Sequence, residues 1–233
     1  MSSDRIEAAR RRYAIPQWSE GLFDVDADGL LVAAPVGANG PKLALTRIVE
    51  QARSQGMRLP LLVRFPDLLK YRAGQLREAF ESAISHAEYA GAYTPVYPIK
   101  VNQQASVVGA LASVPELGLE VGSKPELITA LAVSRPGGTI VCNGYKDAQY
   151  IRLAFSGIRL GLKIIIVIEK PGEWPLIHKH AKALGVEPTL GVRLRLSALG
   201  KGNWQNTGGE RAKFGLAAGQ LLELVEHIRE AGC

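Results

Sequence analysis

The sequence predicts an α/β fold, a (β/α)8 TIM-type barrel that is incomplete in this chain and carries a small N-terminal extension. Three observations lead to this prediction. Apolar runs of strand length alternate with amphipathic helical patterns along most of the chain. Several of these runs, such as residues 164–168, are continuously aliphatic, which is typical of parallel strands buried on both faces. Polar residues follow the runs at intervals of roughly 20 to 26 residues, the length of one strand–helix unit.

Residues 1–40 are predicted to form an appendage to the barrel. Residues 5–12 suit a short charged helix. The Asp28-Gly29 pair suits the turn of a hairpin between residues 22–23 and 30–32, because this dipeptide favours the backbone conformation of a tight hairpin.

Residues 41–233 are predicted to be the barrel part. A helix is expected over residues 43–55, and a strand over residues 60–65 between two prolines. A long helix with one apolar stripe then begins near Asp67, and the strand after it ends at Lys100. The remaining elements are expected at 105–113 (helix), 117–121 (strand), from 123 (helix), 139–142 (strand), 147–155 (helix), 163–168 (strand), 175–184 (helix), 189–196 (strand), 200–209 (glycine-rich loop) and 216–231 (helix).

The polar residues at the strand ends are Lys100, Glu120, Asn143, Glu169 and Arg195. In a barrel of this type the carboxyl ends of the strands carry the active site. A lysine held there and partly stripped of water can react as a neutral amine and form a Schiff base, whereas an ordinary strand-end lysine is solvated. A doubly wound open sheet would give the same rhythm, but no Gly-x-Gly-x-x-Gly turn follows the first strand.

Composition limits the classes of function. The 233 residues are 47% hydrophobic and 21% charged, as in an ordinary globular protein. The net charge of +6 permits an anionic ligand, but the basic residues are scattered and lack interleaved aromatics, which argues against nucleic acid. Cys142 and Cys233 form no zinc or disulfide pattern, and we expect a reducing cytoplasmic location.

Membrane and metal sites are not expected. The N-terminus lacks the apolar core of a signal peptide, and the aliphatic run at 164–168 is too short to cross a bilayer. The segment 24–29 imitates the start of a calcium loop, but Pro35 stands where that loop needs a bidentate glutamate.

Four segments together resemble one enzyme family. They are residues 97–103 (Tyr-Pro-Ile-Lys-Val-Asn-Gln), 119–127, 141–147 and the stretch from Gly191 through Trp204 to Leu216. These segments resemble the biosynthetic arginine decarboxylases, which share a pyridoxal-phosphate barrel with alanine racemase and with ornithine and diaminopimelate decarboxylases. The resemblance covers essentially the whole chain.

The resemblance implies site residues one by one. Lys100 matches the lysine that carries pyridoxal 5'-phosphate and is the implied catalytic residue. Glu120, Ser123, Asn143 and Arg195 match positions near the cofactor.

Each of these matches has a structural alternative. Ser123 with Glu126 also reads as a helix-capping box, and Asn143 with Lys146 as a turn. Arg193 competes with Arg195, because alternate residues of a strand share a face.

The implied activity is decarboxylation of L-arginine to agmatine and CO2, the first step of a route to putrescine and spermidine. The resemblance also implies a homo-oligomer and an association with Mg2+, without a metal site in this sequence. The alternatives are a barrel protein that binds pyridoxal phosphate without catalysis, or a decarboxylase of ornithine, lysine or diaminopimelate. A basic nucleic-acid-binding module is the third class.

The sequence departs from the family pattern at its C-terminal side. From Pro60 onwards it supplies five or six strands where a closed barrel needs eight. The family's cofactor-stacking histidine, phosphate loop, ring-nitrogen carboxylate and C-terminal β-domain are absent from residues 1–233. We therefore expect an N-terminal fragment that is inactive alone.

Overall fold

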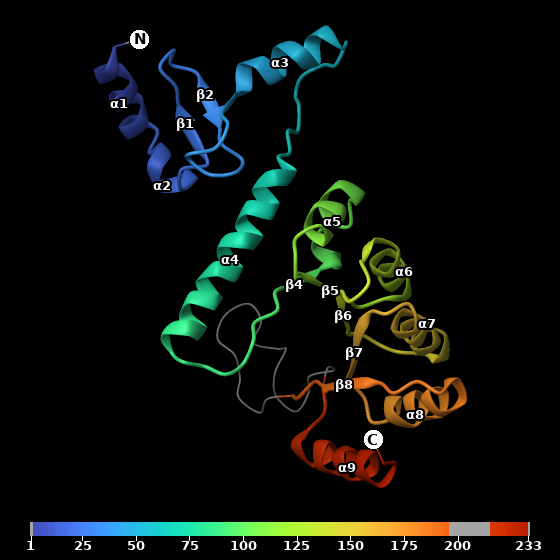
Figure 1. The fold of residues 1–233 in the computed structure, drawn as a ribbon. Coiled ribbons are helices and arrows are strands. Elements are labelled where there is room, and N and C mark those ends of the chain that lie inside the picture. Colours follow the sequence, from blue (N-terminus) through green and yellow to red (C-terminus); the bar gives the residue numbers. More distant parts are fainter. Residues whose placement is uncertain (1, 196–214, 233) are drawn as a thin grey trace. The chain divides into compact units, whose positions relative to one another are not determined.

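The computed structural model describes residues 2–195 and 215–232 of the chain. The chain divides into two compact units, Met1–Ala92 and Tyr93–Cys233 (Figure 1). The predicted division at residue 40 falls within the first unit. All of the residues that the sequence places at strand ends belong to the second unit.

The first unit contains the predicted hairpin. Phe23 pairs with Ala33 and Val25 with Leu31 in an antiparallel ladder, and Gly29 in the turn has a φ of +84° that favours glycine. A third short strand extends the sheet in the order β1-β2-β3. The elements of this unit are α1 (Ser3–Arg12), α2 (Ile15–Ser19), β1 (Phe23–Val25), β2 (Leu31–Ala33), β3 (Leu43–Ala44), α3 (Leu45–Ser54) and α4 (Pro66–His86).

The strand predicted over residues 60–65 is wrong. Residues 61–65 carry no regular secondary structure and pair with no strand among the described residues, and Leu62 is 79% exposed. A strand needs a neighbour to satisfy its N–H and C=O groups. Pro60 and Pro66 also remove two N–H donors from the ends of this run.

The long helix predicted from Asp67 is present as α4, and Pro66 occupies its first turn. Its apolar stripe does not form a core, because no residue of α4 is buried. Leu76 and Phe80 remain nearly half exposed.

The second unit is a five-stranded parallel sheet in the order β4-β5-β6-β7-β8, with a helix after each strand. This arrangement confirms the predicted α/β class, and five strands form only part of a barrel wall, since a closed barrel has eight. The elements are β4 (Val96–Pro98), η1 (Ile99–Val101), α5 (Ala105–Ala112), β5 (Gly118–Val121), α6 (Lys124–Val133), β6 (Thr139–Cys142), α7 (Ala148–Arg159), β7 (Lys163–Ile168), α8 (Glu173–Leu184), β8 (Thr189–Val192) and α9 (Ala218–Glu230).

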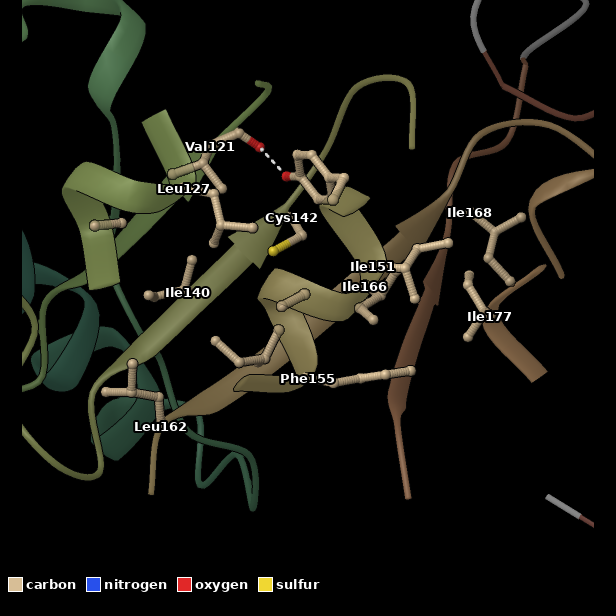
Figure 2. Packing of buried hydrophobic residues seen from close by; sticks show 14 of the residues in the cluster. Val121, Leu127, Ile140, Cys142, Ile151, Phe155, Leu162, Ile166, Ile168 and Ile177 are labelled. Atoms are coloured by element: carbon tan, nitrogen blue, oxygen red, sulfur yellow. Dashed lines mark hydrogen bonds between the residues drawn. The ribbon is translucent and has the colours of Figure 1, made fainter. Parts of the chain in front are cut away.

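One face of the parallel sheet is packed against its helices (Figure 1). Along β7 the side chains of Ile164, Ile166 and Ile168 are buried, whereas Ile165 and Val167 between them are only half buried. Figure 2 shows Ile166 beside Ile151 and Phe155, which project from α7 towards the strands. The core therefore lies on the helix side, and the opposite face of the sheet is less covered.

The strand register aligns the residues of this opposite face. Pro98 is paired with Glu120, Glu120 with Val141, Val141 with Ile165 and Ile165 with Thr189. Because side chains alternate between faces, residues at even offsets from this row lie on the same face of their strands. Glu120 lies in this row, and the other polar residues that the sequence placed at strand ends follow just beyond their strands, at the carboxyl edge of the sheet.

Candidate active site

Lys100 lies just beyond the end of β4. The strand ends at Pro98, and a single 3-10 turn, η1, carries the lysine, so the predicted strand end is shifted by two residues. Ile99 is fully buried in the core while Lys100 is exposed. The amine of Lys100 is therefore accessible at the carboxyl edge of the sheet.

The loop after Lys100 is held in place by two hydrogen bonds. The hydroxyl of Tyr97 donates to the carbonyl oxygen of Asn102 at 3.2 Å, and the backbone N–H of Gln104 donates to Asn102 Oδ1 at 3.0 Å. The first bond spans the turn that contains Lys100, so the position of this lysine is defined by its neighbours in sequence.

Glu120 and Asn143, which the sequence placed at the ends of two strands, are in contact. Asn143 Nδ2 donates to Glu120 Oε1 at 2.9 Å, and the backbone N–H of Asn143 donates to Val121 O at 2.8 Å. The next residue, Gly144, has a φ of +73°, and a Cβ there would lie 2.2 Å from Gly122 O. Only glycine allows the two loops to approach so closely.

Ser123 caps α6. Its hydroxyl oxygen accepts the backbone N–H of Glu126 at 3.4 Å, and Glu126 Oε2 accepts the backbone N–H of Gly122 at 2.8 Å. These bonds satisfy donors at the start of the helix. They confirm the capping interpretation, and a cofactor contact of Ser123 stays a prediction.

Arg193, one of the two competing arginines, forms an ion pair with the neighbouring strand end. Its Nη1 donates to Glu169 Oε1 at 3.1 Å. A Cβ at Gly191, two residues earlier, would lie 3.2 Å from Val167 Cγ2. Gly191 and Val167 therefore both lie on the less covered face of the sheet. Arg195 is anchored through its backbone, since its N–H donates to Leu216 O at 2.8 Å.

Glu169 is buried at the carboxyl end of β7, with its side chain 1% exposed. Its Oε1 accepts hydrogen bonds from Arg193 and from the backbone N–H of Gly144, the latter at 3.2 Å. Its Oε2 is buried and accepts no hydrogen bond from the described residues. The sequence placed Glu169 among the strand-end residues but did not identify it as a site residue.

Two further buried residues lie at this edge, Lys146 and Glu173. The resemblance matched Lys146, with Asn143, to a motif that faces the site, with a turn as the favoured alternative, whereas Glu173 was not identified. The Lys146 side chain is fully buried, and its Nζ lies 3.7 Å from Glu173 Oε2. Burial lowers the pKa of Lys146, and the charges of Glu173 and Glu169 act in the opposite direction. The sequence signal that could have identified Glu173 is its place in the first turn of a helix, four residues after the strand-end Glu169.

The glycine-rich loop predicted at 200–209, which contains Trp204, lies outside the described residues. Within residues 2–195 and 215–232, no group of three or more His, Cys, Asp or Glu side chains is arranged to hold a metal ion. Over the same residues, no helix combines the length and apolar character needed to span a membrane.

Residues 74–232 match the protein family described as "Pyridoxal-dependent decarboxylase, pyridoxal binding domain". The chain is also similar to curated proteins named biosynthetic arginine decarboxylase. The protein from Xanthomonas axonopodis pv. citri is 55% identical over 232 residues, which are 99% of this chain and 37% of that protein. The protein from Pseudomonas aeruginosa is 48% identical over 229 residues, which are 97% of this chain and 36% of that protein. The chain thus spans little more than a third of the length of these relatives.

Two solved structures share the fold. The biosynthetic arginine decarboxylase from Campylobacter jejuni superimposes with a TM-score of 0.82 at 32% identity, over 94% of this chain and 35% of that chain. The diaminopimelate decarboxylase from M. jannaschi superimposes with a TM-score of 0.65 at 24% identity, over 90% of this chain and 44% of that chain.

Proposed function

Because the chain belongs to the pyridoxal-dependent decarboxylases, through their pyridoxal-binding domain, we propose that the protein decarboxylates L-arginine to agmatine and CO2. The names of the relatives support arginine as the substrate. The structural observation that carries the proposal is the accessible amine of Lys100. It lies just beyond β4, which pairs with β5, and Glu120 on β5 is hydrogen-bonded to Asn143 just after β6.

The residues at this edge fit pyridoxal phosphate. The cofactor requires an amine that can reach its aldehyde, and Lys100 is exposed while its neighbour Ile99 anchors the turn in the core. The cofactor is also an anion, because it carries a phosphate group. Arg193, held by its ion pair with Glu169, places a guanidinium at the same edge. Lys100 would hold the cofactor through Nζ, with Glu120, Ser123, Asn143 and Arg195 as further proposed contacts.

When bound, the cofactor supplies an electron sink for the electron pair that is left when the carboxylate departs as CO2. The described residues contribute placement. The hydrogen bond from Asn143 fixes the orientation of the Glu120 carboxylate, and Glu169 fixes the guanidinium of Arg193. Such fixed polar groups stabilise developing charge without having to reorganise during the reaction.

We further propose that agmatine made by this protein feeds polyamine synthesis, that the protein acts in the cytoplasm and that it forms a homo-oligomer. The word "biosynthetic" in the relatives' names supports the first point. Cys142 is a free, buried thiol, in keeping with a reducing compartment. We propose no residues for the association with Mg2+, because the described residues contain no group of three or more His, Cys, Asp or Glu side chains arranged to hold a metal ion.

The test uses the protein at its full encoded length with pyridoxal phosphate, offered arginine, ornithine, lysine and diaminopimelate separately. We expect agmatine from arginine, detected by mass spectrometry, and a loss of at least about 10³-fold in Lys100→Ala. Borohydride reduction should attach the cofactor to Lys100 and not to the buried Lys146.

Each alternative gives a different result in this test. Product from another amino acid but not from arginine would reassign the substrate. Labelled Lys100 without product from any of the four would favour a non-catalytic binding protein. Cofactor attached elsewhere would remove Lys100 from its proposed role.

A further inference from the structure

Glu173, the first residue of α8, joins two loops of the candidate site through one buried carboxylate. Its Oε2 accepts the backbone N–H of Glu169 at 2.9 Å, and its Oε1 accepts the backbone N–H of Lys146 at 3.3 Å. Glu173 is only 5% exposed. The loop after β6 and the end of β7 are therefore tied to the same side chain.

Lys146 completes the arrangement from the other side. Its Nζ donates to Gly144 O at 2.6 Å and lies 3.7 Å from Glu173 Oε2. Both side chains are almost completely buried, the lysine at 0% and the glutamate at 6% exposure. Neither is exposed enough to contact a ligand directly, so any effect on the site must act through other residues.

The loop that this pair holds carries two of the site contacts. Asn143, at its start, donates to Glu120, and Gly144 donates its backbone N–H to Glu169 Oε1. Glu169 in turn accepts from Arg193. The polar groups of strands β5 to β8 at this edge are thus linked in one chain of contacts that passes through the loop after β6.

Stability alone does not account for a buried ion pair. Replacing such a pair with apolar side chains of similar volume is often neutral or stabilising, because desolvation of two charges offsets their attraction. Two backbone N–H groups and one carbonyl oxygen here form hydrogen bonds with the polar atoms of Lys146 and Glu173. A pair of this kind defines one loop conformation where an apolar pair would allow several.

We propose that Lys146 and Glu173 are positioning residues for the active site: they hold the loop after β6 so that Asn143 and Glu169 orient Glu120 and Arg193. This inference rests on the proposed function for its effect on the cofactor. Its structural half, the locked loop, can be measured without any cofactor.

The experiment compares Glu173→Gln, Lys146→Met and the double variant with wild type, in the full-length protein. The controls are Lys124→Met and Phe155→Leu. Lys124 also joins neighbouring loops, through Asp147 at 2.7 Å, but this pair is exposed. Phe155→Leu lowers stability from within the core by about 1–2 kcal/mol, away from the carboxyl edge.

We expect faster amide hydrogen exchange at Gly144 and Glu169 in both single variants, with pyridoxal phosphate bound at least about tenfold more weakly. The visible circular dichroism of the bound cofactor should change, and kcat should fall more than KM changes. The double variant should regain thermal stability, because it removes both charges, without regaining cofactor affinity. Lys124→Met and Phe155→Leu should keep the wild-type spectrum and affinity.

The inference is overturned if amide exchange is unchanged in the single variants. It is also overturned if their exchange is faster but their cofactor affinity and spectrum equal those of the control Phe155→Leu. Recovery of cofactor affinity in the double variant would also overturn it, since the pair would then matter only for its charge balance. Failure of the proposed function is distinguished by the wild type, which would bind no cofactor and form no agmatine.

Discussion

At the residue scale, Lys100 and Lys146 show how the fold gives two lysines at one edge different roles. Lys100 is exposed one turn beyond β4, whereas Lys146 is enclosed by Gly144 and Glu173. A buried amine that already donates to a carbonyl oxygen cannot reach a cofactor aldehyde. Both lysines follow strands in the sequence, and burial separates the candidate for covalent chemistry from the one that organises a loop.

The thiol of Cys142 gives a pH prediction at the same scale. Burial raises its pKa to about 11, so at pH 8 only about one molecule in a thousand carries the reactive thiolate. We expect negligible alkylation of Cys142 by iodoacetamide at pH 8, in a Cys233→Ser background, and rapid alkylation once the protein is unfolded. Labelling of the folded protein at the rate of a free cysteine would contradict the burial of this side chain.

At the element scale, the strands and helices of the parallel sheet follow the local sequence. The structure places β6 and β7 at the residues predicted and β5 within one residue, because short, mostly apolar runs bounded by glycine and polar residues favour a buried strand. The predicted strand at 60–65 is also a short, mostly apolar run, but it has no neighbouring strand among the described residues. A local sequence pattern predicts a strand, but the strand forms only where a neighbouring strand pairs with it.

Ser123 allows the two roles considered for it to be separated. Ser123→Ala should destabilise the protein by about 1 kcal/mol, since a side-chain acceptor at the start of α6 is lost. Ser123→Asn should recover most of that stability, measured by thermal unfolding, because asparagine caps equally well. If cofactor affinity follows stability in both variants, Ser123 is only a cap. A loss of affinity in Ser123→Asn would support a direct cofactor contact of the serine hydroxyl.

At the scale of the whole molecule, the parallel sheet has two outer strands. Among the described residues β4 pairs only with β5, and β8 with β7. Val96 on β4 is an exposed apolar side chain, at 36%, whereas the chain beyond β8 is bridged from Leu194 to Leu216. Unpaired strand edges with apolar side chains favour association with another chain.

We therefore expect the 233-residue chain to self-associate, with sedimentation coefficients that rise with concentration. The variant Val96→Lys should weaken this association by about tenfold or more, because like charges brought together at an interface are unfavourable. Leu222→Lys, at a 66% exposed position on α9, is the matched control. A monomer at all concentrations would show that the β4 edge is protected, and equal weakening by Leu222→Lys would show that this edge is not the interface.

The sequence by itself determined the α/β class, the order of most elements and the set of polar residues at the carboxyl edge, because these follow from hydrophobic period and turn residues within single strand–helix units. The tertiary structure decided the contacts between units. It paired Arg193 with Glu169, joined Asn143 to Glu120, and buried Lys146 against Glu173. These contacts join residues 23 to 27 positions apart in sequence. Strand register and side-chain burial bring these residues together, and no local sequence pattern contains either.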